Sequence, residues 1–150
     1  RECDVAKSVA DLVEHYLTAA GVDVVGNMQN DNLWEITCAA NESDADIFIS
    51  IHCNAFNGMA QGTEVEVHPG SRAGKKLGRC IQWQITDSLG TVDRGLKYRP
   101  DLWVIKSTDM PAVLVELAFI DNTGDAALLR DRQDAFARAI ARGVTDYALQ

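Results

Sequence analysis

Two short apolar runs dominate the pattern of hydrophobic and polar positions, and each predicts a buried strand. The first spans Asp46 to His52 and contains the sequence IFISI, and the second, AVLVELAFI, spans Ala112 to Ile120. Continuous apolar runs of this length, bounded by turn residues, are typical of strands that are covered on both faces. Each run carries one ionisable side chain of interest, because His52 ends the first and Glu116 lies inside the second.

Apolar residues at helical spacing predict four helices. The first covers residues 5–20 and ends at Gly21, a residue type that commonly follows the last turn of a helix. The second covers residues 33–42, and the third covers residues 71–89 with a serine as its N-cap. The last is a C-terminal helix whose apolar face runs from residue 136 to residue 148.

Three weaker segments predict shorter strands, at residues 22–25, 63–68 and 102–106. In the segment 63–68 two valines alternate with two glutamates and His68, so one face of this strand is expected to be wet. His68, at the end of the segment, could line the rim of a site, and a plain surface position is the alternative.

Helices alternate with apolar strands along the chain, with no internal repeat and no linker. This order predicts one domain over residues 1–150, a three-layer α/β domain with a twisted, mostly parallel sheet and helices on both faces. The composition, 47% hydrophobic and 24% charged, is ordinary for a globular domain. The chain has no run of about 18 apolar residues, so no membrane span is expected.

The net charge of −8 narrows the range of partners. Phosphate binding needs a surplus of Lys and Arg, so we expect no nucleic-acid partner. The acidic charge also argues against simple electrostatic adhesion to anionic membranes or polymers.

Four cysteines, Cys3, Cys38, Cys53 and Cys80, are scattered along the chain without a CxxC pair. This spacing does not fit a cysteine-rich zinc site. We expect small buried thiols. A disulfide is compatible with an exported protein, and the sequence leaves its pairing open.

The candidate chemistry rests on His52 and Glu116. Functional groups gather at the carboxyl ends of parallel strands, and His52 lies at such an end. A carboxylate inside an apolar strand is costly unless it is paired, protonated or near a metal. A strand-end histidine alone is more often structural. The presence of one ionisable side chain in each of the two apolar strands, however, predicts a site. Cys53 should not pair with His52, because adjacent strand residues point to opposite faces. With no GxSxG elbow and no phosphate loop in the chain, metal-assisted hydrolysis is the best chemical fit.

These residues belong to a larger set of motifs, and through that set the chain resembles the zinc-dependent N-acetylmuramoyl-L-alanine amidases of the Amidase_3 type. The matching segments occur in the family's order and cover almost the whole chain. They are RECDVA at Arg1, ADIFISIHCNAFNG at Ala45, GTEVEV at Gly62, DRGLKYRPDLWVIKSTDMPAVLVELAFIDN at Asp93, and the final helix. Any one short motif is weak, but the ordered set is strong and the last long block is quite specific.

The resemblance implies a six-stranded sheet and a zinc hydrolase that cleaves the amide bond between N-acetylmuramic acid and L-alanine in peptidoglycan. It implies Glu2 and His52 as zinc ligands and Glu116 as the catalytic acid/base. The family's third ligand is a histidine on a first strand that precedes the position of Glu2. We therefore expect this chain to be N-terminally incomplete, with that strand and histidine upstream of Arg1. We also expect an extracytoplasmic location and separate wall-binding modules in a longer protein.

Substrate contacts are expected at Asn54, Asn57 and Arg94. For the asparagines, turn formation is an equal alternative, and an exposed arginine is more often merely solvated. The connection between His52 and Gly62 is too short for the autoinhibitory helix that some relatives carry there, which predicts an open site.

Two other functions stay open. A metal-free, non-catalytic cell-wall binding domain would account for a missing zinc ligand, but the presence of Glu2, His52 and Glu116 opposes it. A different zinc peptidase on a similar sheet, such as a carboxypeptidase, is opposed by the long block from Asp93 to Asn122.

Overall fold

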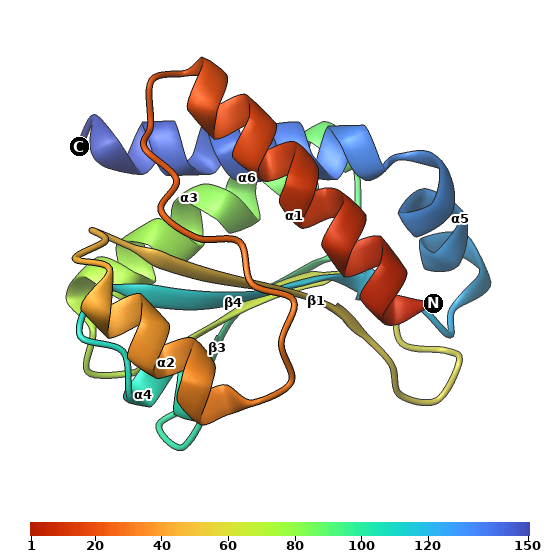
Figure 1. Ribbon diagram of the computed structural model, residues 1–150. Helices are drawn as coiled ribbons and strands as arrows, with labels where there is room; N and C mark the ends of the chain where they lie inside the picture. The colour runs from red at the N-terminus through yellow and green to blue at the C-terminus, as the bar shows by residue number, and fades with distance from the viewer.

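A four-stranded sheet lies between two layers of helices in the computed structural model, which describes all residues from 1 to 150 (Figure 1). The elements in chain order are α1 (Glu2–Ala19), α2 (Leu33–Glu42), β1 (Phe48–Asn54), β2 (Thr63–Val67), α3 (Arg72–Leu89), β3 (Asp93–Tyr98), α4 (Trp103–Lys106), β4 (Ala112–Phe119), α5 (Thr123–Asp131) and α6 (Gln133–Ala148). Helices α1, α3 and α6 cover one face of the sheet, and α2 and α4 lie on the other (Figure 1). The predicted three-layer α/β domain is confirmed. None of the helices has the length and apolar character that crossing a membrane requires.

The strands follow the order β1-β4-β2-β3 across the sheet. Strand β1 runs parallel to β4 and β2 runs parallel to β3, whereas β2 and β4 are antiparallel. The sheet is therefore mostly parallel, as predicted, with one antiparallel junction at its centre. It has four strands where the resemblance implied six, and β1 is an edge strand with no partner on its outer side.

The two faces of the sheet bury different amounts of apolar surface. Under α1, α3 and α6, residues such as Val115 of β4 and Val65 of β2 belong to a core of 20 buried side chains. The other face has a cluster of four, which are Val104, Ile105, Ala112 and Leu114. Successive strand residues point to opposite faces, so Glu116 follows Leu114 on this second face, at the point where the small cluster ends.

Capping residues set the helix boundaries where the sequence predicts them. The Ser71 hydroxyl accepts a hydrogen bond from the Gly74 N–H at 2.9 Å at the start of α3, and Gly90 ends that helix with a φ of 68°. Gly21, with a φ of 85°, follows the end of α1. The side chain of Asn32 caps the start of α2. Short polar side chains and left-handed glycines supply the partners and the geometry that helix ends need.

Residues 22–25 do not form the predicted strand. Val22 and Val24 pack against the core whereas Val25 is 54% exposed, so the alternation of side chains is real. The segment has no strand beside it, however. A strand needs hydrogen-bonding partners for its backbone as well as alternating side chains.

The predicted strand at residues 102–106 is also wrong, because most of this segment forms helix α4. Val104 and Ile105 are buried, and a short apolar run does not distinguish a buried helix from a strand. The sequence pattern indicates neither β3 nor α5. In β3, an edge strand, Leu96 is the one side chain that packs against the main core, so the segment shows no clear alternation.

Gly143 is required where α6 crosses α3, and its replacement tests that contact. A Cβ atom at this position would lie 2.7 Å from the Cα atom of Ile81. We expect Gly143→Ala to lower the free energy of unfolding by about 1–3 kcal/mol, because the overpacking outweighs the gain of roughly 1 kcal/mol in helix propensity. Urea denaturation measures this difference. Gly26→Ala is the control, since nothing lies within 4 Å of the added carbon there, and equal stability of the two variants would contradict the prediction.

Candidate active site

The register of three strands places three ionisable side chains in one row. His52 of β1 is aligned with Glu116 of β4, and Glu116 is aligned with Glu64 of β2. Residues directly opposite each other on neighbouring strands present their side chains on the same face. The structure therefore brings together the two residues that the sequence singles out, on the face of the sheet that carries α2 and α4.

The first turn of α1 adds a fourth member to this site. The Glu2 carboxylate lies with its Oε1 atom 3.6 Å from Nδ1 of His52, and both side chains are about half exposed, at 49% and 45%. The other ring nitrogen of His52, Nε2, lies 2.9 Å from the hydroxyl oxygen of Ser50. The imidazole is thus held by Ser50 on one side and presents Nδ1 to the Glu2 carboxylate on the other.

This arrangement fits two of the ligands of a zinc ion. The separation of 3.6 Å is longer than an ordinary N–H···O hydrogen bond. Two ligand atoms bound tetrahedrally to zinc at 2.0–2.2 Å lie about 3.4 Å from each other. A metal-bound histidine normally uses its second nitrogen in a hydrogen bond, as His52 does with Ser50. The 150 residues hold no group of three His, Cys, Asp or Glu side chains that could bind a metal.

Glu116 is partly buried, and its Oε2 atom is buried without a hydrogen-bond partner. Burial raises the pKa of Glu116 to about 8, and the negative charges of Glu66, Glu2 and Glu64 contribute in the same direction. The Arg99 guanidinium partly opposes this shift. In the metal-free protein this carboxyl therefore holds a proton at neutral pH. It is a carboxyl with an unused oxygen, beside the His52–Glu2 pair.

The two glutamates of β2 correct the prediction that one face of this strand is wet, because Glu64 and Glu66 are buried. The Arg94 Nε group donates to Glu64 at 2.8 Å, and an Arg99 Nη1 group donates to Glu66 at 2.7 Å. Burial raises the pKa of Glu66, and Arg99 counteracts that rise. Glu64, Glu66 and Arg99 were not predicted from the sequence as neighbours of Glu116. The sequence signal for them is the Glu-Val-Glu-Val alternation. We interpreted its glutamates as facing solvent rather than as paired with arginines.

The predicted substrate contacts have identifiable partners within the protein. The Asn57 side-chain oxygen accepts hydrogen bonds from Met59 N–H at 3.0 Å and Ala60 N–H at 2.9 Å, which is the turn-forming role. The Asn54 oxygen accepts from the next residue in the chain at 3.2 Å. Arg94 is paired with Glu64 and also lies over the Phe119 ring. Substrate binding by Asn54 and Arg94 stays a prediction.

His68 does not lie at the rim of this site. Strand β2 runs antiparallel to β4, and Val67 is aligned with Val113 near the start of β4. The turn that holds His68 is therefore at the opposite end of the sheet from the carboxyl end of β4.

The four cysteines are free thiols, and Cys53 alone among them is fully buried. Burial raises the pKa of the Cys53 thiol to about 12. Cys3 is exposed, and Cys38 and Cys80 are intermediate, so the expectation of buried thiols holds for one residue of the four. Cys53, the neighbour of His52 in the chain, is therefore a packing group rather than a nucleophile, because its thiol is buried and has a high pKa.

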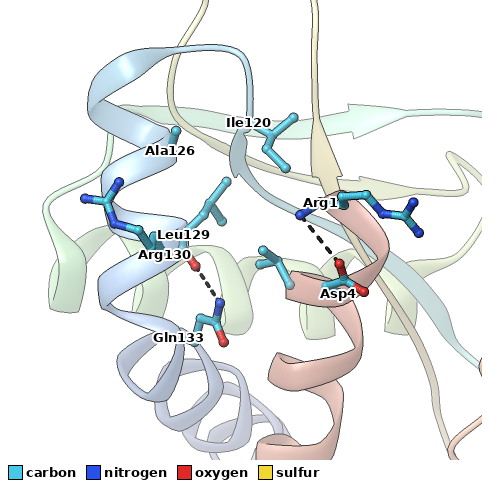
Figure 2. Close-up of a pocket in the computed structure, with 8 residues that line it drawn as sticks. Arg1, Asp4, Ile120, Ala126, Leu129, Arg130 and Gln133 are labelled. Carbon is cyan, nitrogen blue, oxygen red and sulfur yellow. Dashed lines mark hydrogen bonds and ion pairs between the residues drawn. The ribbon is translucent and has the colours of Figure 1, made fainter.

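A separate pocket of about 410 Å³ lies between the start of α1 and α5 (Figure 2). Its apolar floor includes Ile120 and Leu129, and the side chains of Arg1 and Arg130 point away from it in Figure 2. None of the residues of the row described above lines this pocket. Within the row, the His52 side chain is about half exposed whereas Glu64 is buried.

The fold and the site together define an α/β domain with a histidine–carboxylate pair beside a partly buried glutamate. The sequence profile of the N-acetylmuramoyl-L-alanine amidase family, Amidase_3, matches residues 1–146. The chain belongs to this family.

Individual relatives agree with this assignment. The chain is 36% identical to protein YqiI of Bacillus subtilis over 154 aligned residues, which cover 97% of this chain and 74% of YqiI. It is also 36% identical to the N-acetylmuramoyl-L-alanine amidase LytC of the same organism, covering 97% of this chain and 31% of LytC. The chain therefore corresponds to less than a third of LytC.

Solved structures confirm the fold. The crystal structure of an N-acetylmuramoyl-L-alanine amidase from Clostridium difficile 630 matches with a TM-score of 0.93 at 27% identity, over 100% of this chain and 85% of that one. The catalytic domain of the amidase CwlV from Bacillus (Paenibacillus) polymyxa matches with a TM-score of 0.89 at 30% identity, over 99% and 85% of the two chains.

Asp125 connects the elements around the site, and its removal should destabilise the fold. This carboxylate is buried and accepts hydrogen bonds from the N–H groups of Gly62 at 2.8 Å and Phe119 at 2.9 Å. Asp125→Ala leaves two buried donors unsatisfied, so we expect a loss of about 2–5 kcal/mol in the free energy of unfolding. Chemical denaturation gives the value. Asp121→Ala is the matched control, because its two hydrogen bonds are exposed, and a similar loss in both variants would contradict the prediction.

Proposed function

We propose that this protein is a peptidoglycan hydrolase that cleaves the amide bond between N-acetylmuramic acid and L-alanine, with zinc as its cofactor. The observation that carries the proposal is the row in which Glu116 stands in register with His52, whose Nδ1 lies 3.6 Å from Glu2. The family to which the chain belongs and the amidase LytC support the same reaction.

Glu2 and His52 would hold the metal, and Ser50 would fix the orientation of the His52 ring. We propose that a histidine outside residues 1–150 completes the ligand set, as the resemblance to the family implies. Zinc supplies Lewis acidity, which polarises an amide carbonyl and lowers the pKa of water. Two protein ligands are fewer than the three that catalytic zinc sites normally use, so residues 1–150 form the catalytic part of a domain that needs one more ligand.

Glu116 would transfer the proton that the hydrolysis requires. Its Oε2 atom makes no hydrogen bond within the protein, so the carboxyl has hydrogen-bonding capacity left for a bound water molecule or a substrate atom. As a carboxylate, a form that a neighbouring dication favours, it accepts a proton from the attacking water. It then returns that proton to the nitrogen of L-alanine as the carbon–nitrogen bond breaks. A neighbouring dication would lower the pKa of Glu116 from its metal-free value of about 8, toward the range in which a carboxyl acts both as a base and as an acid near neutral pH.

The site of action follows from the substrate. We propose that the protein works outside the cytoplasm on the cell wall, as the name of a relative from Bacillus anthracis, a cell wall amidase, also indicates for that protein. Wall-binding modules elsewhere in a longer protein are part of this proposal.

A metal-free wall-binding domain is the second candidate, and one observation favours it. The described residues offer two metal ligands and not three. A partly buried glutamate with an unpartnered oxygen opposes it, because a binding domain gains nothing from that costly group.

Replacement of Glu116 separates these two functions. We expect Glu116→Gln to lower the rate of release of L-alanine amino termini from peptidoglycan by about 10²–10⁴-fold in the zinc-loaded full-length protein, because the proton carrier is lost. Zinc content should not change. The matched control is Glu42→Gln at the end of α2, which should cleave at the wild-type rate.

Three results of that assay have different meanings. Cleavage by wild type and Glu42→Gln but not by Glu116→Gln supports the amidase. Equal cleavage by all three contradicts the role of Glu116. If wild type binds zinc but releases no L-alanine termini, the substrate assignment is wrong, and if it neither binds zinc nor cleaves, the wall-binding domain is the better account.

Ser50 provides a test of the metal site that does not depend on activity. The Ser50 hydroxyl touches His52 but is not a proposed ligand. We expect Ser50→Ala to weaken zinc affinity by about 10–100-fold in the full-length protein, because the ring loses the partner that orients it. Competition with a chromophoric chelator measures the affinity. His15→Ala is the control, and wild-type affinity in Ser50→Ala would contradict the proposal that Ser50 orients His52 for the metal.

A further inference from the structure

The connection between β1 and β2 exposes two large apolar side chains beside the site. In this connection, residues 55–62, Phe56 is 77% exposed and Met59 is 80% exposed. The connection starts directly after the strand that carries His52 and projects past the N-terminal end of α1 (Figure 1). Four residues of chain span at most about 14 Å, so the backbone of Phe56 lies within that distance of His52.

The backbone of this connection is held in place by the segment that follows β4. The Asp121 carboxylate accepts hydrogen bonds from Phe56 N–H at 2.9 Å and from Gly58 N–H at 3.2 Å. The Asn122 side-chain amide donates to the Gly58 carbonyl at 3.2 Å. The exposed side chains are thus attached to a fixed backbone, which is itself connected to the strand of Glu116.

Hydrogen bonds within the connection, and the position of its last residue, Gly62, also hold its backbone in place. The Asn57 oxygen accepts from Met59 and Ala60, and the Gly62 N–H donates to buried Asp125. Gly62 has a φ of 115°, and a Cβ atom there would lie 2.4 Å from the Val92 carbonyl oxygen. A preorganised segment loses little conformational entropy when it binds a ligand. Scattered apolar side chains are normal on surfaces, but two on a braced segment at the edge of a site indicate a binding role.

The chemistry of the connection favours one part of the proposed substrate. Residues 55–62, AFNGMAQG, contain no charged side chain. The Asp121 carboxylate accepts hydrogen bonds from the backbone of this connection. Arg94 borders Gly62 but is paired with Glu64, and Arg99 is paired with Glu66. Stem peptides carry free carboxylates, whereas the N-acetylated sugar rings of the glycan have neutral, partly apolar faces. An uncharged apolar surface offers no partner to the carboxylates of the stem peptide and suits the neutral faces of the sugar.

We propose that residues 55–62 form a sugar-binding platform on which Phe56 packs its ring against an N-acetylated sugar of the glycan strand and Met59 makes a second apolar contact. This assignment rests on the proposed peptidoglycan amidase function and adds the part of the substrate that the platform recognises. Phe56 and Met59 determine where the glycan lies and take no part in proton transfer.

Binding measurements test the platform apart from catalysis. In the full-length protein with Glu116→Gln, which binds without turnover, the dissociation constants for an N-acetylglucosamine tetramer and for a free stem tetrapeptide are measured by calorimetry or NMR titration. We expect Phe56→Ala to weaken tetramer binding by about tenfold or more, as for an aromatic anchor at the centre of a contact. Met59→Ala should weaken it less, and Phe56→Trp should stay within about threefold of the parent.

Trp83→Ala is the matched control. Trp83 is 60% exposed on α3, which packs on the opposite face of the sheet from Glu116. Its loss should leave tetramer binding unchanged. With Glu116 intact, Phe56→Ala should raise KM for peptidoglycan about tenfold and leave kcat unchanged, because the ring contributes to binding and not to chemistry.

The following results would contradict the proposal of a sugar-binding platform. Tetramer affinity in Phe56→Ala equal to that of the parent rejects it, as does a parent that binds no tetramer. A loss of affinity for the stem peptide instead of the sugar shows that the segment recognises the peptide. Failure of the amidase function is distinct, because it is observed as absence of L-alanine release in protein with Glu116 and Phe56 both intact.

Discussion

The pairing of β4 with β1 on one side and β2 on the other is the constraint on which the rest of the site depends. It aligns His52, Glu116 and Glu64 in a single row. A slip of one residue in either ladder would turn a whole strand over and exchange its core side chains for its site side chains. The 20-residue core on the opposite face therefore fixes the register, and the register fixes the chemistry.

The site also requires compensation of negative charge, because several carboxylates lie close together at the end of the small apolar cluster on the face of α2 and α4. Glu64 and Glu66 are buried, yet each is matched by an arginine from β3 or the residue after it. These pairs make little net contribution to stability, since the cost of desolvation offsets the attraction. The arginines offset only part of this charge, because Glu66 and Glu64 still raise the pKa of Glu116. Unlike Glu64 and Glu66, Glu116 has no arginine partner, a difference that agrees with the proton-transfer role proposed for it.

Much of this could be predicted from the sequence, and the exceptions have physical causes. The strands around His52 and Glu116 were recognisable because a continuous apolar run of that length, bounded by turn residues, is typical of a buried strand. Burial itself was predicted correctly for β4 but not for β1, which is only partly buried because it lies at the edge of the sheet. The strand expected at 22–25 failed because side-chain alternation does not report whether a backbone partner exists. The burial of Glu64 and Glu66 was missed because their arginine partners are about 30 residues away in sequence, and only the parallel pairing of β2 with β3 brings them together.

The acidic balance of the chain affects how copies of it behave toward one another. The net charge of −8 keeps copies apart at neutral pH. That repulsion fades toward the isoelectric point near 4.7. Colloidal stability of these 150 residues is therefore electrostatic in origin, and it declines with acidification and with added salt.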